Sequence, residues 1–186
     1  MKMTPRREFH PLQAVEIAAA FEAERVDYLF IGKGAAILLG FPGTTQDVDV
    51  FVSKSPGNPD RIVRALRRAG FELDESASRE IRAAKDFVQI KSGPFDVDLV
   101  FAPDGIDSFA AASARSVQVE NFRIANLQDI IASKRASGRR KDIADLPMLE
   151  AFREEYEKRL RRPLRSAAET AAARPAESCD EDPAAG

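Results

Sequence analysis

The 186-residue sequence contains no tryptophan, one cysteine and one histidine. A single cysteine, Cys179, excludes an intrachain disulfide and any zinc site built on several cysteines. The single histidine, His10, precedes a proline at the expected start of a helix and has no acid or nucleophile near it in sequence. We therefore expect His10 to cap a helix or lie on the surface, and we expect no chemistry based on histidine.

Long apolar runs are also missing. No segment approaches the roughly 20 consecutive apolar residues that cross a bilayer, and the N-terminal stretch MKMTPRREF lacks the apolar centre of a signal peptide. We therefore expect a cytoplasmic protein with no membrane partner. The formal net charge is only −2, because arginine-rich stretches in the middle balance an acidic, alanine-rich end. This overall charge does not indicate nucleic-acid binding.

The length and the 44% hydrophobic content suit one domain with a true core. We expect this domain to cover residues 1–163, with a core over 11–125 and C-terminal helices over 126–162. The segment 164–186 consists of alanine, glutamate, proline and serine with almost no large apolar residue. It is predicted to be a disordered tail.

Hydrophobic periodicity and turn residues divide the chain into alternating helices and strands. Helices are expected over residues 11–25, 34–40, 59–69, 106–114 and 140–160. Strands are expected over residues 27–32, 46–52, 87–91, 95–101 and 117–125, the third and fourth forming a hairpin. Asn126, with Asp129 three residues later, is expected to begin another helix that Gly138 ends. Pro147 either bends the last helix or begins it afresh.

Aspartates alternate with apolar residues in two of these strands. Asp47 and Asp49 lie two residues apart in QDVDVFV, so their side chains share one face while the valines cover the other. Asp98, in FDVDLV, could complete a carboxylate cage from a neighbouring strand, whereas Asp96 is interpreted as an outer-edge acid. Mg²⁺ binds carboxylates, water and substrate phosphates, and two such ions about 4 Å apart activate a hydroxyl and stabilise leaving pyrophosphate.

A glycine turn precedes the first of these strands. Glycines between a strand and a helix let backbone N–H groups approach a triphosphate. The whole pattern, from GKG through Asp-Val-Asp to Val-Asp-Leu, resembles the nucleotidyltransferase-fold superfamily, which is polymerase-β-like. It is similar to the stand-alone enzymes of that superfamily related to abortive-infection toxins. The resemblance covers residues 11–150 and implies an α/β (α+β) domain with a small mixed, largely antiparallel sheet flanked by helices, and a helical C-terminal portion.

The resemblance also assigns roles to residues. It implies that Asp47, Asp49 and Asp98 hold Mg²⁺ or Mn²⁺ and carry the catalysis. Gly32 and Lys33 stand at the turn pair, where a glycine or serine usually follows the first glycine. The next loop often reads Pro-Arg-x-Thr-x-Asp-x-Asp. Here a threonine, Thr45, matches, and Gly43 stands in place of the arginine. The resemblance implies that Gly32, Lys33, Thr45 and Lys134 bind an NTP.

Lys134 lies on the apolar stripe of its helix, where a charge is unexpected. Its ammonium either extends along the stem to solvent or reaches the phosphates or carboxylates of the cleft. The sequence contains two further groups of basic residues. The group at 61, 64, 67 and 68 is interpreted as an ordinary solvated face. The group at 135, 139, 140 and 141 is the better candidate for contact with a polyanionic acceptor.

The expected reaction is transfer of a nucleoside monophosphate from an NTP to a hydroxyl, with release of pyrophosphate. Two alternatives stay open. Because Lys33 and Gly43 depart from the family pattern, the domain could instead be a catalytically silent nucleotide-binding or interaction module. It could also be a carboxylate-metal phosphodiesterase that activates water. The acceptor is open among tRNA ends, protein hydroxyls and small molecules, and a toxin role would imply an antitoxin partner.

Overall fold

A computed structural model describes residues 9–161 of the chain. The chain divides into two compact units, residues 1–153 and 154–186, and the architecture given below is that of the first unit. The predicted disordered tail, residues 164–186, lies outside the described residues. No helix within residues 9–161 combines the length and the apolar character needed to cross a membrane.

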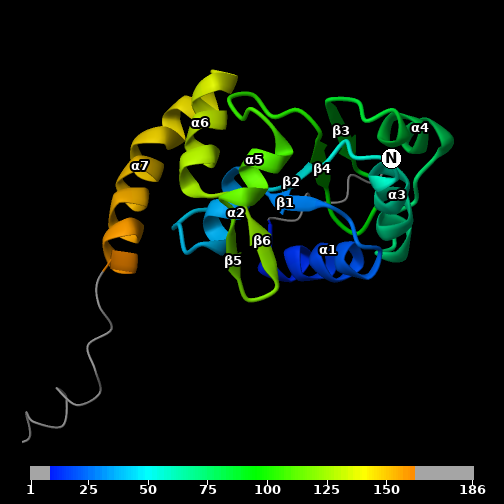
Figure 1. Cartoon of the computed structure of the whole chain (residues 1–186), viewed down its shortest axis with the longest axis horizontal. Coiled ribbons are helices and arrows are strands. Elements are labelled where there is room, and N and C mark those ends of the chain that lie inside the picture. The colour runs from blue at the N-terminus through cyan, green and yellow to red at the C-terminus, as the bar shows by residue number, and fades with distance from the viewer. Residues whose placement is uncertain (1–8, 162–186) are drawn as a thin grey trace, which may run out of the picture. The chain divides into compact units, whose positions relative to one another are not determined.

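Seven helices and six strands make up the described residues (Figure 1). The helices are α1 (Pro11–Ala23), α2 (Gly32–Leu38), α3 (Asn58–Arg68), α4 (Glu75–Arg82), α5 (Phe109–Ala114), α6 (Leu127–Ser137) and α7 (Arg140–Arg161). The strands are β1 (Tyr28–Phe30), β2 (Val48–Val52), β3 (Phe87–Ile90), β4 (Val97–Val100), β5 (Val117–Val119) and β6 (Phe122–Ile124).

The six strands form one mixed sheet in the order β3-β4-β2-β1-β6-β5. Three of the five pairings are antiparallel, namely β3 with β4, β2 with β1, and β6 with β5. The other two, β4 with β2 and β1 with β6, are parallel. The predicted fold class is confirmed: a small mixed sheet, antiparallel in most of its pairings, is flanked by helices and followed by a helical C-terminal portion.

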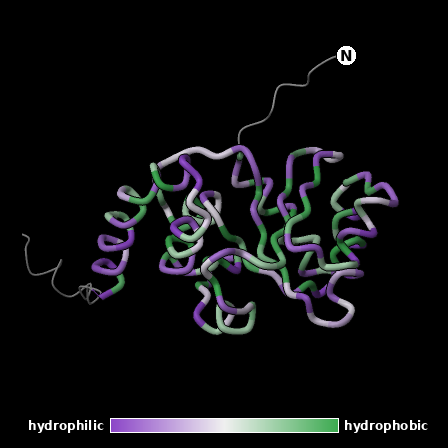
Figure 2. The backbone as a smooth tube through the Cα atoms, turned by 90° about the horizontal axis from the view of Figure 1, so that it is seen from above, coloured by the Kyte–Doolittle hydropathy of each residue, from purple (hydrophilic) through white to green (hydrophobic). Residues whose placement is uncertain are grey.

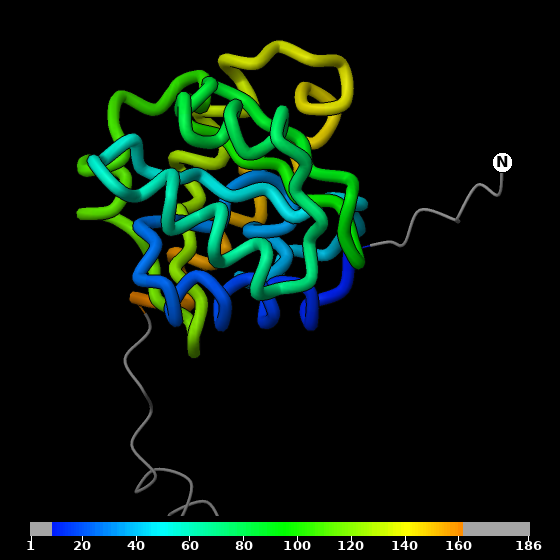
Figure 3. The backbone as a smooth tube through the Cα atoms, turned by 90° about the vertical axis from the view of Figure 1, so that its right-hand side faces the viewer, coloured from blue at the N-terminus to red at the C-terminus, as the bar shows by residue number. Residues whose placement is uncertain are grey.

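The core lies between the sheet and helices α1 and α3, which pack side by side (Figure 3). Phe21 of α1 meets Tyr28 of β1 edge to face, with ring centroids 5.1 Å apart. Ile17 of α1 and Leu66 of α3 are also fully buried, and each such side chain contributes about 1.5–3 kcal/mol when removed from water. Figure 2 shows the hydrophobic residues gathered along the central strands. This core fixes β1 and β2, on which the candidate site is built.

Three predicted helix boundaries are confirmed. His10 caps α1, because its Nδ1 accepts a hydrogen bond from the backbone N–H of Leu12 at 3.2 Å. Asn126 caps α6 through its Oδ1, which accepts from the backbone N–H of Asp129 at 2.8 Å. Gly138 ends α6 in the left-handed conformation, with φ +63°, which glycine adopts without steric cost.

Other boundaries differ from the sequence-based expectation. The single strand expected over 117–125 is wrong, because Glu120 adopts φ +50° and folds this stretch into the β5–β6 hairpin. The stretch before β3, where the sequence predicts neither a helix nor a strand, contains helix α4, which the side chain of Asp74 caps. Helix α2 begins at Gly32, two residues earlier than expected, and α5 begins only at Phe109. Pro147 lies within α7, so it does not begin a new helix.

Candidate functional site

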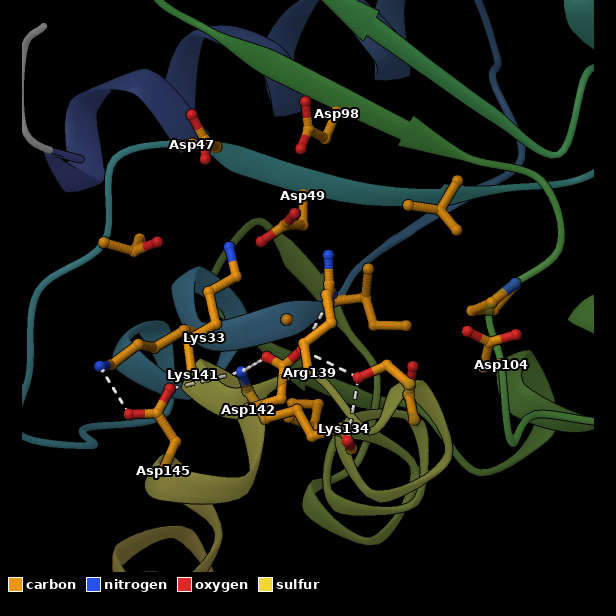
Figure 4. Close-up of a pocket in the computed structure, with 18 of the residues that line it drawn as sticks. Lys33, Asp47, Asp49, Asp98, Asp104, Lys134, Arg139, Lys141, Asp142 and Asp145 are labelled. Carbon is orange, nitrogen blue, oxygen red and sulfur yellow. Dashed lines mark hydrogen bonds and ion pairs between the residues drawn. The ribbon is translucent and has the colours of Figure 1, made fainter.

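Two of the predicted carboxylates face each other across neighbouring strands. Asp49 of β2 is the direct Cα partner of Asp98 of β4 in the parallel β2–β4 pairing. Asp47 immediately precedes β2 and lies two residues before Asp49, on the same face. The valines at 48 and 50 are buried on the opposite face, so the alternation turns the carboxylates away from the core. Figure 4 shows the three aspartates gathered on one side of a cleft.

Neighbouring carboxylates disfavour the ionisation of Asp49 and of Asp98. Burial, followed by the negative charges of Asp98 and Asp47, raises the pKa of Asp49 from 3.8 to about 7, against the opposing charges of Lys134 and Lys141. Burial also raises the pKa of Asp98, although a hydrogen bond from Gln89 opposes this shift. A carboxyl group whose pKa is raised in this way is stabilised in its ionised form by any cation that binds beside it.

The glycine turn packs directly on Asp49. Gly32 adopts φ +73°, and a Cβ at this position would lie 2.4 Å from Oδ2 of Asp49. The N–H of Ile31, one residue earlier, donates to the backbone oxygen of Asp49 at 3.0 Å. A side chain at position 32 would therefore occupy the space around the carboxylate. The glycine therefore lets the Asp49 carboxylate pack directly against the turn.

Lysines line the opposite side of the cleft. Lys134 is only 9% exposed, and its Nζ lies 2.7 Å from Oδ1 of Asp142 and 3.4 Å from Oδ2 of Asp145. The ammonium therefore pairs with cleft carboxylates and does not extend to solvent. Lys33, at the second position of the glycine turn, donates to Oδ1 of Asp145 at 2.9 Å. These ion pairs join α2 and α6 to the first two turns of α7.

Asp142 is the most completely bonded acid of the cleft. Burial opposes its ionisation, but hydrogen bonds from Lys134, Ser137 and Arg139 outweigh that effect and lower the pKa of Asp142 to about 2. The Ser137 and Arg139 bonds measure 2.8 and 2.6 Å. Asp142 is thus ionised throughout the physiological range and anchors the start of α7 to the end of α6.

Lys141 differs from the other cleft cations. Lys33, Lys134 and Arg139 each form an ion pair with an aspartate, whereas Lys141 forms none within the described part of the chain. Its side chain lines the cleft on the side facing the three aspartates (Figure 4). Its positive charge lowers the pKa of Asp49. Lys141 is therefore the cation most readily available to an anionic ligand.

The cleft has a volume of about 630 Å³ and brings together all seven residues singled out from the sequence. They are Gly32, Lys33, Thr45, Asp47, Asp49, Asp98 and Lys134. Sequence reasoning missed Asp145 and the role of Gln89. The sequence does contain a signal for Asp145. Asp142 and Asp145 lie three residues apart on one helix, which follows the helix of Lys134 after a short loop, and the charge of Lys134 on an apolar stripe calls for an acidic partner. No comparable signal identifies Gln89, whose contact depends on strand register.

The donor set of the cleft fits a hard divalent cation. In residues 9–161 no three His, Cys, Asp or Glu side chains form a complete metal-ligand group by themselves. Mg²⁺ needs less than that from a protein, because it keeps several waters and takes further oxygens from substrate phosphates. The facing carboxylates of Asp49 and Asp98 and the adjacent Asp47 could supply hard oxygen ligands to such an ion.

The arginines of α3 are held by neighbouring side chains outside the cleft. Arg61 pairs with Asp27 and Arg64 with Glu24, each at 2.9 Å, and Arg67 donates to the Ser78 hydroxyl at 3.3 Å. Arg64 and Arg67 are exposed. This arrangement agrees with the interpretation of these residues as a solvated face.

No protein-family model matches this chain, and no curated protein matches it.

Proposed function

We propose that the chain is a cytoplasmic, metal-dependent nucleotidyltransferase, which moves a nucleoside monophosphate from an NTP to a hydroxyl acceptor and releases pyrophosphate. The observation that carries the proposal is the direct register of Asp49 with Asp98 across parallel strands. With Asp47, they form an acidic side that faces a basic side made of Lys33, Lys134, Arg139 and Lys141 (Figure 4). A metal-bound triphosphate needs both sides at once.

The acidic side would hold the metal. Asp47, Asp49 and Asp98 would supply the carboxylate oxygens, and Gly32 lets the Asp49 carboxylate pack directly against the glycine turn. Bound Mg²⁺ or Mn²⁺ would activate the acceptor hydroxyl and stabilise charge on the leaving pyrophosphate. Lys141 would orient the phosphates together with Lys33 and Lys134 on the basic side, and Thr45 lines the same cleft. No side chain of this chain has to act as a nucleophile.

Pyrophosphate release tests this proposal. The purified chain is incubated with each of the four NTPs, Mg²⁺ or Mn²⁺, and an acceptor panel of tRNA, protein and hydroxyl-bearing small molecules. With NTPs labelled at the α-phosphate, we expect the unaltered chain to release pyrophosphate and to label the acceptor. We expect Asp49→Asn to do neither. Near-native pyrophosphate release by Asp49→Asn would refute the assignment of Asp49.

One observation favours a second candidate, a nucleotide-binding module without catalysis. The ammonium groups of Lys33 and Lys134 are already paired with aspartates, so a ligand has to compete for them. Tight NTP binding without any pyrophosphate release would select this module. Release of the hydrolysed nucleotide without a labelled acceptor would instead select a phosphodiesterase that activates water. An antitoxin partner remains a proposal tied to the first activity.

A further inference from the structure

Asp145 lies between two ammonium groups that come from distant parts of the chain. Its Oδ1 accepts from Lys33 Nζ at 2.9 Å, and its Oδ2 lies 3.4 Å from Lys134 Nζ. Lys33 belongs to α2, Lys134 to α6 and Asp145 to α7. One carboxylate therefore joins three helices at the wall of the same cleft (Figure 4).

The path of the Lys33 side chain depends on Gly43. A Cβ at position 43 would lie 3.2 Å from Cε of Lys33, closer than ordinary van der Waals contact. The lysine stem therefore crosses the loop where this loop has no side chain. Gly43 thus allows the Lys33 ammonium to reach the wall on which Asp145 lies.

The two aspartates that pair with Lys134 have different surroundings. Asp142 is 2% exposed and accepts from Lys134, Ser137 and Arg139. Asp145 is 23% exposed, and its only ion-pair partners in residues 9–161 are the two lysines. Partly exposed ion pairs contribute little net free energy. Of the two aspartates, Asp145 is therefore the one that a ligand can replace at low cost.

We propose that Lys33 and Lys134 form a binding subsite for the outer phosphates of a polyphosphate ligand, and that Asp145 is the internal counter-ion that the ligand displaces. The inference rests on the proposed function, because it specifies which cations hold the NTP. A phosphate offers paired anionic oxygens as a carboxylate does, and it carries more charge. Asp145 therefore limits affinity for polyphosphate while keeping both ammonium groups in place.

Inorganic tripolyphosphate is the probe, titrated calorimetrically in metal-free, low-salt buffer. We expect Asp145→Asn to bind it at least fivefold more tightly than the unaltered chain, because the internal competitor is gone. The matched control is Asp104→Asn, which removes the same charge from the same cleft at an exposed residue away from the two lysines. It should change affinity by less than twofold. Equal tightening by both variants, or unchanged or weaker binding by Asp145→Asn, would overturn the proposal.

A second variant decides the matter if Asp145→Asn does not fold. Lys33→Met should bind tripolyphosphate at least tenfold more weakly while its circular dichroism spectrum stays native. Lys54→Met is its control, because Lys54 pairs with Asp86 at the rim of the cleft, and it should bind as the unaltered chain does. Native-like binding by Lys33→Met would overturn the subsite. Tripolyphosphate carries no transferable nucleotide, so this result is independent of whether the chain proves to be a nucleotidyltransferase.

Discussion

The side-chain amide of Gln89 donates a hydrogen bond to Oδ1 of Asp98 at 3.0 Å, across the antiparallel β3–β4 pairing. Gln89 is the direct cross-strand partner of Asp98, so register alone brings the two together. The bond favours the ionised form of Asp98 against the effect of burial on its pKa. It also restrains the orientation of the Asp98 carboxylate.

Gln89→Ala should therefore weaken metal binding although it removes none of the proposed metal-binding carboxylates. Loss of a group that orients a metal ligand costs about tenfold or more in affinity, and we expect at least that loss for Mn²⁺, measured by electron paramagnetic resonance. Gln118→Ala is the control, because Gln118 lies on the far edge strand and, within residues 9–161, its side-chain amide bonds only to the backbone oxygen of Glu120. Equal Mn²⁺ affinity in the two variants would show that Gln89 does not orient the site.

The metal-free protein should lose stability as the pH rises. The pKa of Asp49 is about 7 in the folded chain against an ordinary value of 3.8, so the folded chain binds this proton more tightly than the unfolded chain does. That contribution is complete below about pH 4 and is lost as the pH passes 7. Asp49→Asn should thus melt at a higher temperature than the unaltered chain at pH 8, with the difference shrinking toward pH 5. A difference that does not depend on pH would contradict the raised pKa.

Mg²⁺ binding should release protons in the same pH range. A carboxyl with a pKa of about 7 is partly protonated at neutral pH, and a metal ion displaces that proton. We expect apparent Mg²⁺ affinity to fall between pH 7.5 and pH 6, and titration at pH 7 in two buffers of different ionisation enthalpy to reveal proton release. Asp49→Asn should release fewer protons than the unaltered chain.

Gly32→Ala should weaken metal binding in addition to straining the backbone. Gly32 and Gly57 both have positive φ, +73° and +79°, but a Cβ at 57 has nothing within 4 Å while one at 32 lies 2.4 Å from Asp49. The left-handed conformation alone costs roughly 1–2 kcal/mol for alanine. Gly57→Ala should show only this loss of stability and bind Mn²⁺ normally. Gly32→Ala should be less stable still and should lose Mn²⁺ affinity, because its Cβ would displace the Asp49 carboxylate. Similar results for the two variants would show that the position of Asp49 does not depend on a glycine at 32.

Lys134→Met should destabilise the chain, because it leaves Asp142 buried with one fewer counter-charge. Removing one partner of a buried pair costs about 3–5 kcal/mol, and the remaining bonds from Ser137 and Arg139 place the expected loss at the lower end. The pKa of Asp142 should also rise from about 2, so the variant should lose less stability than the unaltered chain as the pH falls below 4. Urea unfolding at pH 7 and pH 3 measures both effects, and equal stability at pH 7 would refute the role of this pair.

The alternation of aspartate and valine predicted the acidic side of the cleft well, because strand geometry is local and has a period of two. The basic side depends on contacts between segments far apart. Lys33 and Asp145 are 112 residues apart, and no local pattern reports such a pairing. Local signals also failed where an unusual backbone angle decides the structure. Glu120 adopts a positive φ without being glycine, and Asn121 alone beside it is a weak turn signal, so the β5–β6 hairpin lacked the glycine that usually reveals a two-residue turn.

The 112-residue interval between Lys33 and Asp145 has a consequence for synthesis of the chain on the ribosome. The sheet strands that carry Asp49 and Asp98 leave the ribosome well before α6 and α7. Until Asp145 has emerged, Lys33 lacks this counter-ion and the cleft lacks one wall. A nascent chain can thus present the acidic side before the opposing lysines have their carboxylate partner Asp145, so the complete cleft assembles only after α7 has emerged.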